Sequence, residues 1–117
     1  MIKIIATLLT IFAFSTSHAK KVNVGIILGF TGPIESLTPD MAAGAELAFS
    51  EASNSGNLLN GSKINVIRAD STCIDSAAAS SAAEGLISQG VTAIMGADCS
   101  GVTGCLLYTS PSPRDRG

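Results

Sequence analysis

The sequence predicts an α/β fold, part of a doubly wound parallel sheet with the element order β-α-β-α-β. Three short, largely β-branched runs alternate with two longer segments of helical character. The links between them are short, and this order forces parallel pairing through right-handed crossovers. With 117 residues, 46% of them hydrophobic and none of them Trp, the chain suffices for one modest domain or part of one.

The first 19 residues have the pattern of a secretory signal peptide. Lys3 precedes an apolar run over residues 4–14, and small and polar residues follow up to Ala19. The run is too short to span a bilayer as a stable helix, and the alternative, a buried core helix, fits the three-part pattern less well. We expect cleavage after Ala19. No cysteine lies there to carry a lipid anchor, so the mature protein should be soluble outside the inner membrane, where disulfides are permitted.

The first strand is predicted over residues 21–28, KVNVGIIL, and suits a parallel strand that is covered on both faces. Pro33 keeps a helix from starting in the turn that follows, because it restricts Gly32 and lacks an amide donor. The first helix then has clear start signals. Thr38 can cap it, Pro39 fits its first position, and Asp40 suits the positive end of its dipole.

One stripe of that helix is expected to face the sheet, while Glu46 and Glu51 are free to face water. The stripe consists of Met41, Ala45, Ala48 and Ala52, with Phe49 beside it.

The second strand is predicted over residues 63–69 and the third over residues 91–95. Asp75 to Gln89 should form the helix between them, and Gly90 should end it in a left-handed conformation. Its residues expected to pack closely on the sheet are Ala77, Ala78, Ala82 and Leu86.

Residues 105–117, CLLYTSPSPRDRG, differ in character, with two prolines, two arginines and no helical stripe. They resemble a translated sequencing-adapter tail, and we treat them as a non-native addition, with a genuine flexible terminus as the alternative. Residues 20–104 then form the structural part, in which four cations face eight carboxylates, a net charge of −4. Because no basic stripe exists to neutralise phosphates, a nucleic-acid partner is excluded.

Without that tail the cysteine count is even. Cys73 follows the second strand and Cys99 follows the third. We expect strands two and three to lie side by side, about 4.8 Å apart, so that a disulfide between these residues is possible. It would tie the loop after the third strand to its neighbour. A zinc site is the competing interpretation, but no His follows Ala19 and no CxxC pair is present.

Known catalytic and cofactor patterns are missing. His18 is the only histidine and is lost with the signal peptide, so no Ser-His or Cys-His nucleophile can form, and we expect no enzyme. The glycines do not have the spacing GxGxxG, and no GK[ST] follows a glycine-rich loop, so we expect no cofactor.

Gly96 to Gly104, GADCSGVTG, is the candidate ligand-binding turn, because ligands of open α/β sheets bind beyond the carboxyl ends of the strands. Ser100 and Thr103 offer hydroxyl groups at what should be the start of a third helix, whose amides favour a small anion such as a carboxylate. Ser100 could instead only cap that helix. Asp98 is as able to accept from loop amides as to face a ligand.

Three stretches of the chain resemble the periplasmic substrate-binding proteins of branched-chain amino acid and amide ABC transporters, of the leucine-binding type. The stretches are KVNVGIILGFTGPIESLTPDMAAGAELAFSEAS, INVIRADSTC and GVTAIMGADCSGVTG, and the resemblance covers Lys21 to Gly104. It implies the first lobe of a two-lobe type I periplasmic binding protein, of which this chain holds an incomplete N-terminal part.

The resemblance also implies roles for single residues. Cys73 and Cys99 match the family's disulfide, and Ser100 matches the serine that holds the ligand's α-carboxylate. Ser36 and Leu37 match the segment that covers the ligand's side chain, where amino acid binders often have an aromatic residue. Leu37 could also simply pack.

The function implied is capture of an amino acid, an amide or a similar small polar solute in the periplasm, with delivery to an ABC permease in the inner membrane. A ligand-sensing domain of a receptor or regulator with the same fold is the alternative.

Overall fold

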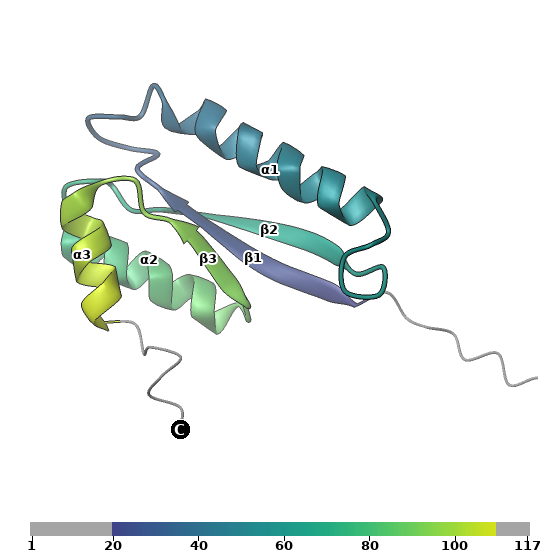
Figure 1. Cartoon of the computed structure of the whole chain (residues 1–117). Coiled ribbons are helices and arrows are strands. Elements are labelled where there is room, and N and C mark those ends of the chain that lie inside the picture. The colour runs from purple at the N-terminus through teal and green to yellow at the C-terminus, as the bar shows by residue number, and fades with distance from the viewer. Residues whose placement is uncertain (1–19, 110–117) are drawn as a thin grey trace, which may run out of the picture.

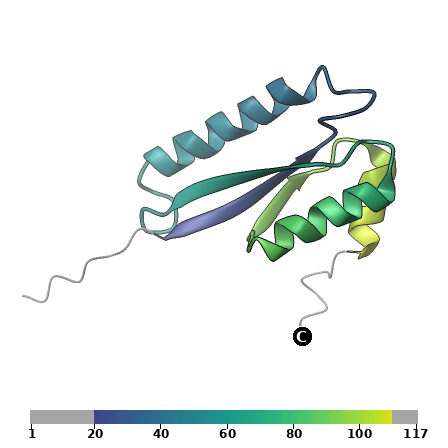
Figure 2. The ribbon, with the colours of Figure 1, turned by 180° about the vertical axis from the view of Figure 1, so that it is seen from behind.

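The computed structural model describes residues 20–109 and contains a parallel three-stranded sheet with helices on both faces (Figure 1). The elements are β1 (Lys21–Leu28), α1 (Thr38–Asn54), β2 (Lys63–Asp70), α2 (Ser76–Ser88), β3 (Ala93–Gly96) and α3 (Ser100–Thr109). Helix α1 covers one face, and α2 and α3 cover the other (Figures 1 and 2). The predicted α/β fold with a parallel sheet is confirmed, whereas the signal peptide, residues 1–19, lies outside the described residues.

The sheet has the order β2-β1-β3, so β1 pairs in parallel with both other strands. The expectation that strands two and three lie side by side is therefore wrong. The crossovers of α1 and α2 run over opposite faces, and right-handed crossovers on opposite faces step in opposite directions across a sheet. As a result β2 and β3 end up on the two sides of β1.

Strand β1 is buried on both faces, as its apolar run predicted. Ile26 and Leu28 pack against Ala42 of α1 on one face. Ile27 packs on the other face, against Ala83 and Leu86 of α2. Alternate side chains of one strand thus form the centres of both hydrophobic clusters.

The start of α1 differs from the expectation. Leu37 occupies the N-cap position without a side-chain hydrogen bond, and Thr38 is the first helical residue. The hydroxyl of Thr38 is buried and donates to the carbonyl oxygen of Gly29 at 3.1 Å. Thr38 therefore ties the helix to the end of β1 instead of capping it.

This tie sets which side of α1 faces the sheet. Ala42 is fully buried, and Ala45 and Phe49 pack beside it, whereas Met41 and Ala48 are exposed. The predicted stripe is thus wrong at Met41 and Ala48 and right at Ala45 and Phe49. The stripe seen begins at Thr38 and repeats with helical spacing, which follows from the buried position of that residue.

Helix α2 fits its predicted bounds, with Asp75 as N-cap and Gln89 as C-cap. The Asp75 carboxylate accepts from the amides of the second and third residues beyond it, and Gly90 is left-handed with φ 75°. The predicted packing is right at Leu86 and Ala82 and wrong at Ala77. The buried residues are Ala79, Ala83 and Leu86, Ala82 packs beside them, and Ala77 is exposed.

Helix α3 continues beyond Gly104 to Thr109, although no helix is predicted from residue 105 onward. Val102 is buried, and Leu106 packs against the hydrophobic cluster that contains Ile27. These two residues of α3 are four positions apart, which is about one helical turn. No helix was predicted there because the sequence shows no repeated apolar positions at helical spacing. The structure shows that Val102 and Leu106 alone provide the packed side of this short helix. Whether the tail is native stays open as a prediction, and residues 110–117 lie outside the described part.

Gly96 is predicted to tolerate no side chain. It has φ 118°, and a Cβ would collide with the carbonyl oxygen of Ile27. We expect Gly96→Ala to lower the free energy of unfolding by about 2–4 kcal/mol. Gly44→Ala in α1 is the control, because open space surrounds that position, and it should stabilise by about 0.5–1 kcal/mol. Urea unfolding measures both, and equal effects would contradict the close approach of β3 to β1.

Candidate functional site

Three loops meet at the carboxyl end of the sheet (Figures 1 and 2). They follow β1 over residues 29–37, β2 over residues 71–75 and β3 over residues 97–99. This is the edge at which ligands of parallel α/β sheets bind. The contacts among the three loops decide which groups are left for a ligand.

Asp98 links the loop after β3 to the end of β1. Both of its carboxylate oxygens accept from the amide of Gly29, at 3.0 and 3.2 Å. Of the two roles considered for Asp98, the structure supports acceptance from a loop amide.

Asp70 links the end of β2 to the loop after β1. Its carboxylate accepts from the hydroxyl of Thr31 at 2.6 Å, the amide of Thr31 at 3.3 Å and the amide of Thr72 at 2.8 Å. Burial pushes the pKa of Asp70 upward, but these hydrogen bonds outweigh it and leave the pKa below its ordinary value. Sequence reasoning did not identify Thr31, although a Thr beside Gly32 in a turn is a signal for such a contact.

The predicted disulfide between Cys73 and Cys99 is confirmed, with 5.3 Å between the two Cα atoms. It forms although β1 separates the two strands, because both loops cross over Gly29. A Cβ at Gly29 would lie 3.0 Å from the Cβ of Cys73. The zinc alternative does not fit Cys73 and Cys99, because their two sulfur atoms are bonded to each other.

The backbone that carries Cys73 is unusual. Thr72 and Cys73 both have positive φ, 58° and 71°, a conformation that costs non-glycine residues free energy. Two hydrogen bonds hold it, from the Thr72 amide to Asp70 and from the Asp75 amide to the Thr72 hydroxyl. The Cys73–Cys99 disulfide is thus attached to a loop whose backbone is held by hydrogen bonds to residues before and after Cys73.

Ser100 is exposed and is the first residue of α3, directly after Cys99. The first amides of a helix have no partner within it, so they remain available near this hydroxyl. Thr103 lies one turn further, and its hydroxyl is directed at the carbonyl oxygens of Cys99 and Ala97, at 2.8 and 3.1 Å. Its single proton is therefore used inside the turn, and only its oxygen lone pairs could meet a ligand.

Ser36 and Leu37 lie in the loop that leads into α1, at the same edge of the sheet (Figure 1). Both are exposed, and 61% of Leu37 is accessible, so Leu37 does not simply pack in the core. The structure thus leaves Ser36, Leu37 and Ser100 accessible at this edge.

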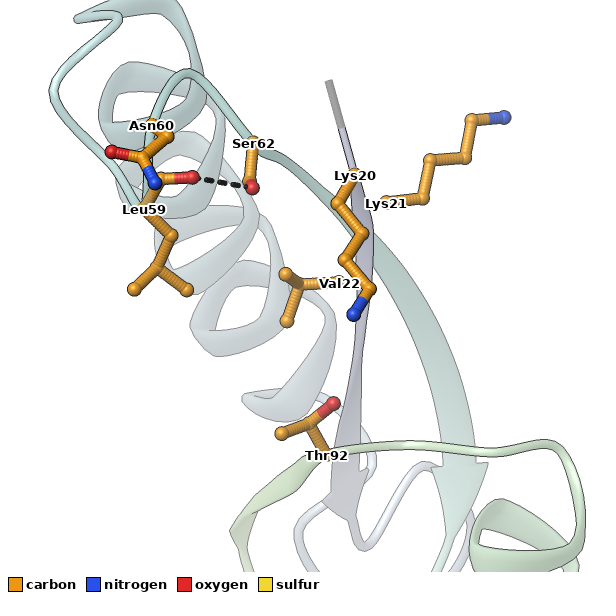
Figure 3. Close-up of a pocket in the computed structure, with 7 residues that line it drawn as sticks. All are labelled: Lys20, Lys21, Val22, Leu59, Asn60, Ser62 and Thr92. Atoms are coloured by element: carbon orange, nitrogen blue, oxygen red, sulfur yellow. Dashed lines mark hydrogen bonds between the residues drawn. The ribbon is translucent and has the colours of Figure 1, made fainter. Parts of the chain in front are cut away.

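A hollow of about 450 Å³ lies at the opposite end of the sheet (Figure 3). Its walls come from the start of β1 and from the turns that precede β2 and β3. The lining residues are Lys20, Lys21, Val22, Leu59, Asn60, Ser62 and Thr92. None of them belongs to the predicted site, so this hollow and the carboxyl edge are separate features.

The comparison with protein families agrees with the sequence resemblance at a coarse level. A family model described as periplasmic binding protein matches residues 21–107, which include every element from β1 to most of α3. No curated protein matches the chain. None of the helices within residues 20–109 is long and apolar enough to cross a membrane.

Removal of the bridge should destabilise the fold. We expect the double variant Cys73→Ala, Cys99→Ala to lose about 2–4 kcal/mol of unfolding free energy, because the bridge closes a loop with a sequence separation of 26. Cys105→Ala lies outside the bridge and should lose less than about 1 kcal/mol. Urea unfolding tests this, and alkylation of Cys73 or Cys99 without prior reduction would contradict the bridge.

The Thr31 contact should stabilise the fold only while Asp70 is ionised. Since the folded pKa of Asp70 is lowered, its contribution is present above the unfolded pKa and is lost as pH falls through the folded pKa. We expect Thr31→Val to cost about 1 kcal/mol at pH 7 and less at an acidic pH below the folded pKa of Asp70. Urea unfolding at both pH values measures this, with Thr92→Val as the control. An equal loss of unfolding free energy at the two pH values would contradict the contact between Thr31 and Asp70.

Proposed function

The chain belongs to the periplasmic binding protein family, and from this we propose that it captures a small polar solute for an ABC importer. Family membership supports solute binding as such. The finer proposal is that residues 20–104 form an incomplete first lobe, that the solute is held between two lobes, and that the closed protein delivers it to a permease in the inner membrane. The solute is an amino acid, an amide or a similar small polar molecule.

The observation that carries this proposal is the position of Ser100. Its exposed hydroxyl stands at the start of α3, next to a cysteine that is bridged to the neighbouring loop. A hydroxyl together with helix N-terminal amides forms a neutral set of donors suited to a carboxylate or an amide oxygen. Thr103 supports the same turn through its bonds to Ala97 and Cys99, and its lone pairs can accept from a polar solute.

The loop before α1 supplies the second part of the half-site. Ser36 offers a hydroxyl and Leu37 an exposed aliphatic surface. Leu37 stands where amino acid binders often have an aromatic residue. We therefore expect a ligand other than leucine. A shorter or more polar side chain, or an amide, fits a hydroxyl beside an aliphatic group better.

We place the protein in the periplasm, with residues 1–19 as signal peptide. A disulfide between Cys73 and Cys99 agrees with that compartment, because disulfides persist in oxidising surroundings. We propose binding without catalysis, since the only histidine of the chain is His18, in the predicted signal peptide.

The role of Ser100 can be tested by calorimetry with a panel of amino acids and aliphatic amides. The measurement uses the two-lobe protein of which we propose this chain is a part. In that protein, Ser100→Ala should weaken binding of the preferred solute by about 10–100-fold, because a hydrogen bond to a charged group is lost. Ser81→Ala, an exposed serine on α2, is the matched control and should bind like the parent.

The 117-residue chain alone should show no micromolar binding to any member of the panel, since a half-site forfeits the contacts of closure. Micromolar binding by this chain would contradict the proposed half-site, and an unchanged affinity in Ser100→Ala would contradict the assignment of Ser100.

A further inference from the structure

The hollow at the amino end of the sheet is built by segments that the backbone holds together. The amide of Lys63 donates to the carbonyl oxygen of Lys20 at 3.1 Å, which joins the start of β2 to the residue before β1. The amide of Thr92 donates to the carbonyl oxygen of Asn23 at 2.8 Å, which joins the residue before β3 to β1. The walls of the hollow are therefore fixed by the pairing of the sheet.

The turn before β2 forms the third wall and is itself held in place. The amide of Ser62 donates to the carbonyl oxygen of Leu58 at 2.8 Å, and its buried hydroxyl donates to that of Leu59 at 2.7 Å (Figure 3). Leu59 and Asn60 are both left-handed, with φ 39° and 60°. Both side chains are exposed and line the hollow, so the turn supplies it with an aliphatic group and an amide.

The charge of the hollow is positive. Lys20 and Lys21 line it, and the described lining residues include neither Asp nor Glu. The single ion pair within residues 20–109 joins Arg68 to Glu46, so neither lysine is neutralised by a carboxylate there. Figure 3 shows the side chain of Lys20 extending in the direction of Thr92, whereas the ammonium group of Lys21 points away. A concave surface with cations of one sign attracts anions.

The carbonyl groups at the end of α1 are the competing partners for these lysines, because α1 ends on the same side of the sheet (Figure 1). A helix C-terminus attracts cations. That role is taken by Lys63, whose ammonium group donates to the carbonyl oxygen of Ser53 at 2.7 Å. Lys20 and Lys21 thus remain available to a ligand.

The size and the apolar part of the hollow indicate more than an inorganic ion. Its volume of about 450 Å³ lies in the range of small-molecule sites. Val22 of β1 and Leu59 contribute apolar surface beside the charged and polar groups. A bare phosphate or chloride ion would leave this surface in contact with water, whereas an anion with a short apolar chain would cover it.

From these observations we propose that the hollow binds a small organic anion, namely a carboxylate that carries a short apolar chain. Lys20 attracts the carboxylate, and the side chains of Asn60 and Thr92 donate hydrogen bonds to it. Val22 and Leu59 pack against the apolar chain. This site goes beyond the proposed function, because it lies at the end of the sheet opposite to the proposed solute site.

The test is an NMR titration of the 117-residue chain with hexanoate. We expect the amide signals of Lys21, Ser62 and Thr92 to shift and to saturate with a dissociation constant of about 1 mM. The amide signal of Ser100 should not move. Hexanol has the same apolar chain without the charge, and inorganic phosphate has the charge without the chain, so each should bind at least about tenfold more weakly than hexanoate.

Charge variants test the assignment of the cation. Lys20→Gln should weaken hexanoate binding by about 3–5-fold, as expected for an exposed ion pair. Asn60→Asp should weaken it by at least about fivefold, because it adds a negative charge to the wall. The matched control is Asn57→Asp, which adds the same charge at an exposed position outside the hollow and should change the affinity by less than about twofold.

Leu59→Asn tests the apolar wall without disturbing the turn, because Asn tolerates the left-handed conformation found at this position. We expect hexanoate to bind at least about threefold more weakly to this variant, since apolar contact is lost. Binding of phosphate should not change. Unshifted amide signals of β1 and β2 in the free variants report that each is folded.

Four results would overturn the proposal. They are amide shifts that do not saturate by about 20 mM hexanoate, hexanol or phosphate binding as tightly as hexanoate, equal losses of affinity in Asn57→Asp and Asn60→Asp, and hexanoate shifts at Ser100 in place of Thr92. The last would move the anion to the carboxyl edge. Because the reporter amides lie at the other end of the sheet, failure here leaves the proposed solute capture untouched, and failure of solute capture leaves this result untouched.

Discussion

The constraint on which the site depends is the absence of a side chain at Gly29. The loops after β2 and β3 have to cross the end of β1 to reach each other, because β1 lies between the two strands. A Cβ at Gly29 would stand 3.0 Å from the Cβ of Cys73, tighter than most Cβ contacts in proteins, so Cys73 would have to shift. The bare backbone lets Cys73 approach, and the amide of Gly29 donates to the Asp98 carboxylate.

This crossing explains how one short turn becomes rigid. Between Ala97 and Thr103 the chain is held by the disulfide at Cys99, by Asp98 on Gly29 and by the hydroxyl of Thr103 on two carbonyl oxygens. A bridge contributes about 2–4 kcal/mol and a hydrogen bond about 1 kcal/mol. Ser100 is the residue within this turn whose side chain is exposed, so the turn fixes the hydroxyl without using it.

Sequence reasoning was most accurate where a local rule decides the structure. The bounds of β1 were right because a strand buried on both faces is mostly apolar, and Gly90 ends α2 as a left-handed residue should. The predicted buried side of α1 was wrong because Thr38 was interpreted as a cap, whereas its hydroxyl donates to the carbonyl oxygen of Gly29, nine residues earlier.

The strand order was wrong because the periodicity of the sequence does not say which face of the sheet a crossover takes. The cysteine pair was nevertheless right, because both cysteines lie in loops at the carboxyl edge, and these loops meet over β1 whichever strands are adjacent.

The distribution of charge bears on what the carboxyl edge can recognise. Residues 20–109 contain four cations, of which Lys20, Lys21 and Lys63 lie at the amino end of the sheet. The fourth, Arg68, is held by Glu46 through two hydrogen bonds of 2.6 and 2.8 Å. That hydrogen bonding lowers the pKa of Glu46.

No unpaired cation within these residues therefore stands at the carboxyl edge to attract a carboxylate over a distance. The carboxylates of Asp70 and Asp98 accept from loop amides and from Thr31, so their hydrogen bonds are directed into the fold. Neutral donors are what this edge presents: the hydroxyl of Ser100 and the first amides of α3. Such groups can donate to the oxygen of an amide as well as to the carboxylate of a zwitterion, and neither contact is an ion pair with a cationic side chain. The proposed delivery of a solute to a second protein would benefit from this property, because tight charge pairing would slow the release.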